Sequence, residues 1–248
     1  MTDNKMRTEI LNIDKGQCLT DVLPAIPANT IFDKTITGCG ATHSEIVNAA
    51  RHSIIIEPNI PVILGKKAEH PFLFAVYEGI TKEDVKAYLA GEHDGYRKII
   101  TTPEGFDKKV LPAMHELEIP VYKDYFLLFD ECEKVIQDVG YRGDIYLPVE
   151  DFFKFENKAM VSATPIVPSD PRFEENGFKI LKLVPTYDSR IELTLCTTNN
   201  TVAVMRKLLK RLENETVCVF LNSTETILSL IYALRLQGRS RVFCSEKA

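Results

Sequence analysis

Two short, almost wholly apolar runs constrain the fold of this chain more than any other feature. One is SIIIEP at 53–58, which Pro58 closes, and the other is the FLLF segment within DYFLLFDECEKVIQD (124–138). A strand with one wet face alternates apolar and polar residues, so unbroken apolar runs are typical of strands covered on both faces. They favour a parallel sheet with helices on both sides.

Strand-like and helix-like segments alternate from about residue 30 to residue 165. The β-branched or apolar segments TIFDKTIT, RKIITTPEGF and NKAMVSATP predict further strands. Three segments predict helices: HSEIVNAAR (43–51), TKEDVKAYLAG (81–91) and, interrupted by Pro112, FDKKVLPAMHEL (106–117). This alternation is typical of βαβ units and predicts an α/β fold with a mainly parallel sheet.

The pattern changes after residue 168. A turn-rich stretch and two expected strands (178–198) lead into an amphipathic segment, TVAVMRKLLKRLENE, that predicts a helix. From residue 216 the order strand, helix, strand predicts a second βαβ unit, which stops unfinished. We expect a first domain at 25–168, a linker with accessory elements at 169–212 and an incomplete domain at 213–248. An unpaired edge strand there would favour a homodimer.

Composition excludes some classes of protein. The chain has 248 residues and a net charge of −5, which argues against binding nucleic acid by bulk positive charge. No apolar run reaches the length of a membrane span, and the N-terminus has no apolar core like that of a signal peptide. The six cysteines are scattered without a CxxC pair. We expect reduced thiols and a cytoplasmic protein without membrane contact.

A glycine loop follows the first predicted strand, in TITGCGATHSE (35–45). Gly38 and Gly40 permit a tight turn, and a strand–glycine–helix order points backbone N–H groups at one position, which favours an anion such as phosphate. The hydroxyl of Thr42 could reach a magnesium ion. The alternative is a structural turn without a ligand, because short glycine turns between strand and helix are common.

Asp130 and Glu131 follow the apolar run of the second buried strand. A buried strand that ends in acids can deliver an aspartate to magnesium and a glutamate to an attacking water. The alternative is an ordinary strand that ends in solvated acids.

Six short motifs, in order, resemble those of superfamily 2 helicases of the DEAD/DEAH-box type. TGCGATH resembles the phosphate loop, IIIEPN motif Ia, IITTPEGF motif Ib, DECE the DEAD box, SAT motif III and VFLNSTETILSLIYAL the start of a second RecA-like domain. The resemblance covers about residues 30–248. It implies a RecA-like fold of the P-loop NTPase type, ATP and Mg²⁺ as cofactors, and nucleic acid as a partner.

The resemblance also implies roles for individual residues. Asp130 would hold magnesium together with Thr42, and Glu131 would position the attacking water. The residues that would cradle the nucleotide are Gly38, Cys39, Gly40, Ala41 and Thr42. Ser162 and Thr164 would couple nucleotide state to nucleic-acid binding. Thr102 and Glu104 would lie near a nucleic-acid backbone.

The sequence departs from the family at three places. Ala41 stands where the family has the lysine that reaches the phosphates, so the Walker A element is degenerate. Glu133 ends the acidic box, and the chain stops before the family's later motifs. Lys34, Arg51 or His43 could restore the lost cation. A metal or redox site of Cys39, Cys132 and His43 is a further alternative.

These features together predict a helicase-like nucleotide-binding module that acts on nucleic acid with weak or no ATP hydrolysis. The alternative is a retired helicase fold that serves as a binding or scaffold module without nucleotide. An active ATPase that uses another cation is the third possibility left open.

Overall fold

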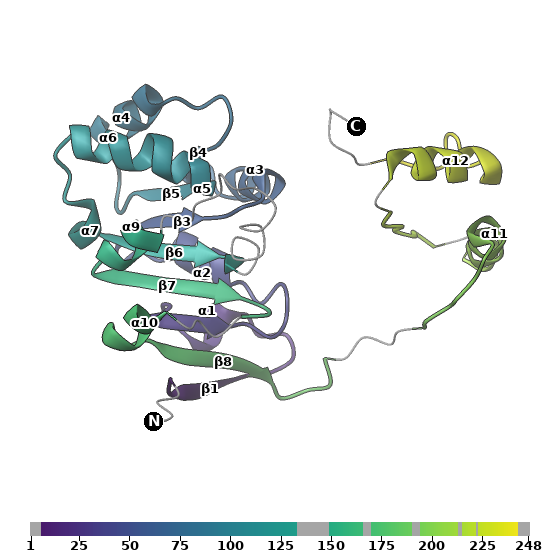
Figure 1. The fold of residues 1–248 in the computed structure, drawn as a ribbon, viewed down its shortest axis with the longest axis horizontal. Helices are drawn as coiled ribbons and strands as arrows, with labels where there is room; N and C mark the ends of the chain where they lie inside the picture. The colour runs from purple at the N-terminus through teal and green to yellow at the C-terminus, as the bar shows by residue number, and fades with distance from the viewer. Residues whose placement is uncertain are drawn as a thin grey trace. The chain divides into compact units, whose positions relative to one another are not determined.

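The computed structural model describes residues 6–132, 149–165, 170–189, 194–212, 215–221 and 223–242. The chain divides into two compact units, Met1–Ser189 and Arg190–Ala248 (Figure 1). Within the described ranges, no helix is both long and apolar enough to cross a lipid bilayer.

An eight-stranded sheet forms the centre of the first unit, with the order β1-β8-β2-β7-β6-β3-β5-β4. All neighbouring strands are parallel, so their carboxyl ends lie at one edge (Figure 1). The predicted α/β fold with a parallel sheet is therefore confirmed. The strands are β1 (Thr8–Ile13), β2 (Thr30–Asp33), β3 (His52–Ile56), β4 (Phe74–Val76), β5 (Lys98–Thr101), β6 (Tyr125–Asp130), β7 (Asn157–Ser162) and β8 (Lys179–Pro185).

Helices cover both faces of this sheet. One face packs against α1 (Leu19–Val22), α2 (Ala41–Val47) and α3 (Ile60–Glu69). The other packs against α4 (Lys82–Ala90), the π-helix η1 (Phe106–Val110), α6 (Leu111–Glu116), α7 (Val121–Asp124), α9 (Val149–Lys154) and α10 (Pro171–Glu175). Strand β6 shows why its sequence is continuously apolar: Leu127 and Phe129 enter one core, whereas Phe126 and Leu128 enter the other.

Two predicted helices have different bounds in the structure. The helix predicted at 43–51 begins at Ala41 and ends at Val47. The side chain of Asn48 accepts a hydrogen bond from the N–H of Ala50 (3.0 Å) and so turns the chain out of the helix. The segment 106–117, expected to be interrupted by Pro112, is helical through this residue, because η1 leads directly into α6 and Pro112 lies in the first turn of α6.

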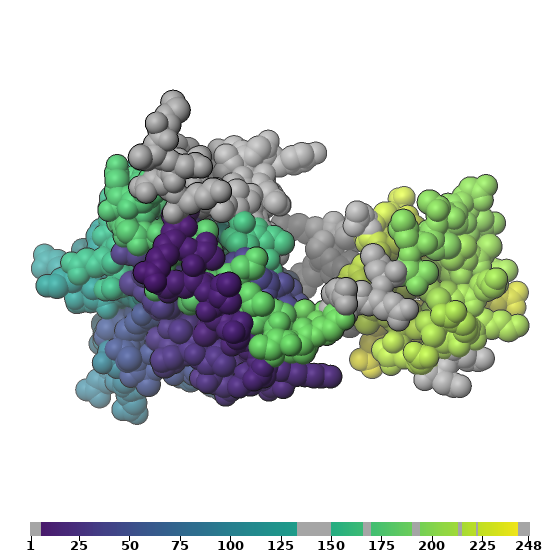
Figure 2. Space-filling model, turned by 90° about the horizontal axis from the view of Figure 1, so that it is seen from below, coloured from purple at the N-terminus to yellow at the C-terminus, as the bar shows by residue number. Residues whose placement is uncertain are grey.

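The sheet extends beyond the expected bounds of 25–168. Strand β1, which the polar N-terminal sequence does not reveal, pairs with β8 from Thr8↔Ile180 to Ile13↔Pro185. Lys179 binds Glu9 at 2.7 Å beside this pair. Figure 2 shows the N-terminal segment against the residues of β8. The first and last strands of the unit therefore lie side by side at one margin of the sheet.

The second unit contains α11 (Thr201–Arg211) and α12 (Thr224–Leu234), which contact each other. Both helices were expected. The strand predicted to begin at Thr216 was wrong for the described residues, because 215–221 adopt no regular structure and Phe220 is 92% exposed. A strand requires a neighbour for its backbone groups, and none lies beside it among the described residues of this unit. Homodimerisation through 213–248 stays a prediction.

Gly105 offers a test of packing at the carboxyl edge of β5. It ends the short helix α5 (Pro103–Gly105), and a Cβ atom there would lie 2.5 Å from Thr101 Oγ1 and 3.2 Å from the carbonyl oxygen of Val76. We expect Gly105→Ala to lower the free energy of unfolding by about 1–3 kcal/mol, measured by urea denaturation.

The matched control is Gly91→Ala. Gly91 has an ordinary φ of −69°, and its nearest neighbour would lie 3.4 Å from an added Cβ. Its stability should be unchanged or slightly higher. Equal stabilities of the two variants would contradict the packing at Gly105.

Candidate functional site

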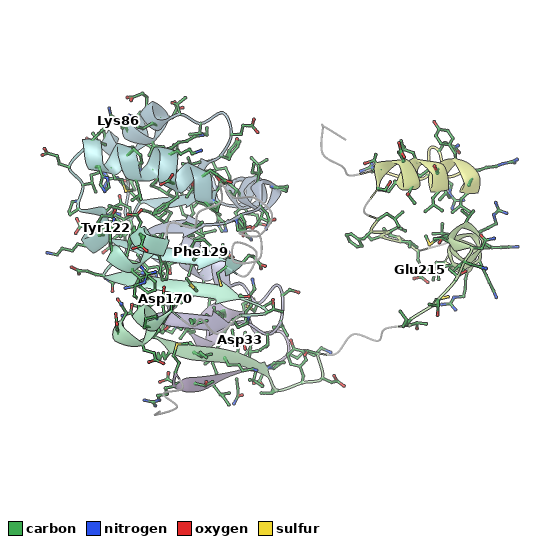
Figure 3. All side chains as sticks on the ribbon, viewed as in Figure 1. Asp33, Lys86, Tyr122, Phe129, Asp170 and Glu215 are labelled. Carbon is green, nitrogen blue, oxygen red and sulfur yellow. The ribbon has the colours of Figure 1, made fainter. Side chains whose placement is uncertain are left out.

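The carboxyl edge of the sheet gathers polar residues from five neighbouring strands. In the order β2, β7, β6, β3 and β5, the strand ends carry Lys34, Ser162, Asp130, Glu57 and Thr102. Figure 3 labels Asp33 on β2 and Phe129 on β6, the residues directly before Lys34 and Asp130. Because the strands are parallel, segments far apart in sequence meet at this edge. Open α/β sheets bind ligands at this edge.

A buried ion-pair cluster lies at its centre. The ammonium Nζ of Lys34 is 2.6 Å from Glu131 Oε1 and 3.4 Å from Asp130 Oδ1. Lys34 and Asp130 are only 8% and 2% exposed. Burial alone would lower the pKa of Lys34, but the two carboxylates outweigh it and raise that pKa above its usual value. The ammonium is therefore held in its charged form.

The glycine loop meets this cluster through Thr42. Its hydroxyl donates a hydrogen bond to Asp130 Oδ2, the oxygen that Lys34 does not contact. Gly38 and Gly40 have φ angles of 74° and 88°, a left-handed conformation that glycine adopts without strain. Nothing lies within 4 Å of a Cβ added at either glycine, so the backbone angle is the constraint there. The structure thus brings together the loop and the acids that the sequence singled out.

Two residues without glycine's freedom are also left-handed here. Glu131 has φ 51°, and its N–H donates to Asp130 Oδ1 at 3.0 Å. Thr35, which is β-branched, has φ 45°, and its hydroxyl donates to the carbonyl oxygen of Leu183 at 2.5 Å. Such conformations cost about 1–3 kcal/mol each and are concentrated at functional sites. Thr35 directly follows Lys34, and Glu131 is part of the ion-pair cluster, so both strained residues lie at the candidate site.

Ser162 and Thr164 form a turn next to this cluster. The N–H of Thr164 donates to Ser162 Oγ at 2.9 Å, and the backbone N–H of Lys34 donates to the carbonyl of Ser162, also at 2.9 Å. Strand β7 thereby joins the strand of Lys34 to the strand of Asp130.

Thr102 and Glu104 lie farther along the edge. Thr102 caps α5, since its Oγ1 accepts a hydrogen bond from the N–H of Gly105 at 3.0 Å, and Glu104 is exposed. Strand β3 separates their strand, β5, from β6. They are therefore neighbours of the ion-pair cluster and not members of it.

Glu57 belongs at this edge but was missed as a site residue. It is 2% exposed at the end of β3, where burial and the charge of Asp130 raise its pKa to about 7. Asn59 opposes this rise through hydrogen bonds from its N–H (2.8 Å) and its side-chain amide (2.7 Å) to Glu57 Oε1. The sequence signal was available, because an acid directly after a buried run is the same pattern that identified Asp130.

Two other candidates for the missing cation have different partners. The guanidinium of Arg51 binds Glu45 at 2.6 Å and lies 3.4 Å from the ring centroid of Phe126. The Nδ1 atom of His43 lies 3.2 Å from His70 Nε2. Lys34 is the one of the three expected cations that contacts the acids.

The donor atoms of the cluster fit magnesium better than a thiolate metal. Proteins hold Mg²⁺ through one or two carboxylates together with phosphate oxygens, and Asp130 and Thr42 present hard oxygen atoms side by side. Burial raises the pKa of Cys39 and so disfavours its thiolate. Among the residues with described positions, no three His, Cys, Asp or Glu side chains form a metal-binding group. Glu133 lies outside the described residues.

Comparison with known proteins supports a helicase-like fold. No protein-family model matches the sequence, and no curated protein is significantly similar to it. The DUF1998 helicase MrfA aligns over 89% of this chain and 38% of its own, with a TM-score of 0.58 and 14% identity. The Hef helicase domain of Pyrococcus furiosus aligns over 95% of this chain and 51% of its own, with a TM-score of 0.39 and 12% identity. This chain thus spans less than two thirds of either protein.

The raised pKa of Glu57 predicts a pH-dependent stability. Its pKa rises from 4.5 to about 7 on folding, so the native state binds the proton more tightly than the unfolded state. The stability contributed by this group is therefore present below about pH 4.5 and is lost as the pH rises through about 7. At 1.36 kcal/mol per pKa unit, Glu57→Gln should be more stable than the wild type at pH 8 by up to about 3 kcal/mol.

Urea denaturation at several pH values measures this difference. The advantage of Glu57→Gln should vanish near pH 4.5. Glu104→Gln, which removes an exposed carboxylate from the same edge, is the control. A Glu57→Gln advantage that does not change with pH would show that the carboxyl group does not titrate as described.

Proposed function

We propose that this chain is a helicase-like nucleotide-binding module that holds Mg²⁺ and ATP at the carboxyl edge of β2 and β6. The observation that carries the proposal is the hydrogen bond from Thr42, in the glycine loop, to Asp130, at the end of a buried strand. A glycine turn that served only to connect β2 to α2 would need no contact with β6. The helicase-like fold supports the same assignment.

The chain's own residues divide the task of binding. Residues 38–42 surround the phosphates, with left-handed glycines that let the backbone approach them closely. Asp130 and Thr42 hold the magnesium ion, which neutralises phosphate charge when bound. Glu131 orients a water molecule toward the terminal phosphate. Its left-handed backbone fixes the direction in which its side chain leaves β6.

Hydrolysis by this chain alone is weak or absent. Ala41 offers no charge-assisted hydrogen bond to the phosphates, a contact of a kind worth about 1.5–3 kcal/mol. The loss affects the transition state more than the bound nucleotide, because a cation stabilises the charge that develops during the reaction.

Nucleic acid is the proposed substrate of the module. MrfA, whose fold is similar, is described as a helicase, and Thr102 and Glu104 lie along the edge at the positions that resemble a backbone-contacting motif. Ser162 and Thr164 couple nucleotide state to nucleic-acid binding, and Ser162 is joined by hydrogen bonds to the backbone of Lys34 and to Thr164. With a net charge of −5, contacts with nucleic acid must be local and not a broad basic face.

A rival function is favoured by one observation. Lys34 already pairs with both Asp130 and Glu131 without a metal ion. A cluster that is satisfied by its own lysine suits a binding or scaffold module that has lost its nucleotide. The two functions differ in whether Mg·ATP binds at all.

Isothermal titration of Mg·ATP into the purified chain separates the two. We expect saturable binding that Asp130→Ala weakens at least tenfold, because the substitution removes a carboxylate from the metal and an acceptor from Thr42. Asp107→Asn, which changes an exposed carboxylate on η1, is the control and should bind like the wild type. No binding to the wild-type protein would support the scaffold function instead.

A further inference from the structure

We infer that Lys34 supplies the positive charge to the nucleotide phosphates, from the end of a strand and not from the glycine loop. The inference rests on the proposed function and deepens it, because it names the residue that compensates for Ala41. It assigns Lys34 two sets of partners, the carboxylates in the free protein and phosphate oxygens in the complex.

The position of the ammonium carries the inference. Lys34 Nζ and Thr42 Oγ1 contact the two oxygens of one carboxylate, that of Asp130. The charge is therefore one carboxylate away from the hydroxyl that directly follows Ala41. The field of the ammonium also reaches the loop. Burial raises the pKa of Cys39; the charge of Lys34 acts against that rise, and the charge of Asp130 adds to it.

The site has the same net charge that it would have with a lysine in the glycine loop in place of Lys34. Lys34 contributes one positive charge, and Asp130 and Glu131 contribute one negative charge each, so the cluster has a net charge of −1. The positive charge of this site is therefore at the end of β2 and not in the glycine loop. A metal ion that took those carboxylates would leave the ammonium of Lys34 as a countercharge for phosphate.

Other lysines of the sheet do not have this geometry. Lys182 pairs with Asp33 at 3.6 Å, but its side chain is 47% exposed. Lys98 and Lys158 are buried near the amino ends of β5 and β7, at the opposite edge. In the described part of the sheet, Lys34 is the buried lysine at the carboxyl edge.

Binding exchanges one ion pair for another. Lys34 would release Asp130 to the metal ion and Glu131 to the attacking water, and its ammonium would pair with phosphate oxygens. No covalent bond changes and no proton is transferred in this exchange. The side chain is unbranched, so the same lysine can serve both sets of partners.

Titrating Mg·ATP into four variants tests this inference. Lys34→Gln keeps hydrogen-bond donors for the carboxylates but removes the charge, and we expect it to bind at least tenfold more weakly than the wild type. Lys34→Arg keeps the charge and should bind within about fivefold of the wild type. The double variant Lys34→Gln/Ala41→Lys should regain at least tenfold over Lys34→Gln. The control Lys182→Gln removes the neighbouring lysine and should bind like the wild type.

The outcomes separate this inference from the proposed function. If the wild type binds and Lys34→Gln binds equally well or more tightly, Lys34 is not the phosphate cation, and the nucleotide site stands. If the wild type does not bind, both fail. Circular dichroism melting of each variant verifies its fold.

A single substitution decides the matter should Lys34→Gln not fold. Ala41→Lys adds a second cation to an intact Lys34 cluster. A gain in affinity of less than tenfold agrees with a phosphate cation already in place. A gain of tenfold or more means that the wild-type site lacks one, which overturns the inference.

Discussion

Two carboxylates at the end of one buried strand require a cation, and the arrangement of the carboxyl edge follows from how Lys34 meets that need. Asp130 is almost inaccessible to water, and a buried carboxylate without a partner is strongly unfavourable. The ammonium of Lys34 reaches it across β7, the strand between β2 and β6. This contact fixes the start of the glycine loop, since the loop leaves β2 directly after Lys34. The hydroxyl of Thr42, farther along the loop, donates a hydrogen bond to the other oxygen of the same carboxylate.

The opposite edge of the sheet also holds a buried carboxylate, that of Glu45, paired with cations. Glu45 is fully buried and binds Arg51, Ser53 and Lys98 near the amino ends of β3 and β5. Burial lowers the pKa of Lys98 to about 8, although the charge of Glu45 opposes this. Each charge there has a partner from α2 or the neighbouring strands, and the guanidinium stacks on Phe126. The amino edge is thus a closed network, whereas the carboxyl edge carries strained backbone and open glycines.

Much of this arrangement could be predicted from sequence because it depends on local patterns. Unbroken apolar runs identified β3 and β6, and glycines followed by a threonine identified the loop that meets Asp130. What could not be predicted depends on distant contacts. Lys34 was one of three candidate cations, and only the three-dimensional structure distinguishes a lysine that reaches β6 from an arginine committed to Glu45. Strand β1 is polar on one side and has no signal until β8 is beside it. The segment at 216–221 has a strand's composition but no neighbouring strand among the described residues.

The pairing of β1 with β8 affects how the first unit forms as the chain leaves the ribosome. Strand β1, which contains Thr8, is made before the other strands of the sheet, but its partner residue Ile180 emerges only after all of them. Strand β2 lies between β8 and β7, and β7 is also synthesised late. Until then β2 lacks both neighbours, with apolar residues that later lie in both cores. Sheets closed by such long-range pairing fold slowly and expose apolar strands while they wait. The apolar residues of β2 therefore stay uncovered on the nascent chain until β7 and β8 have been made.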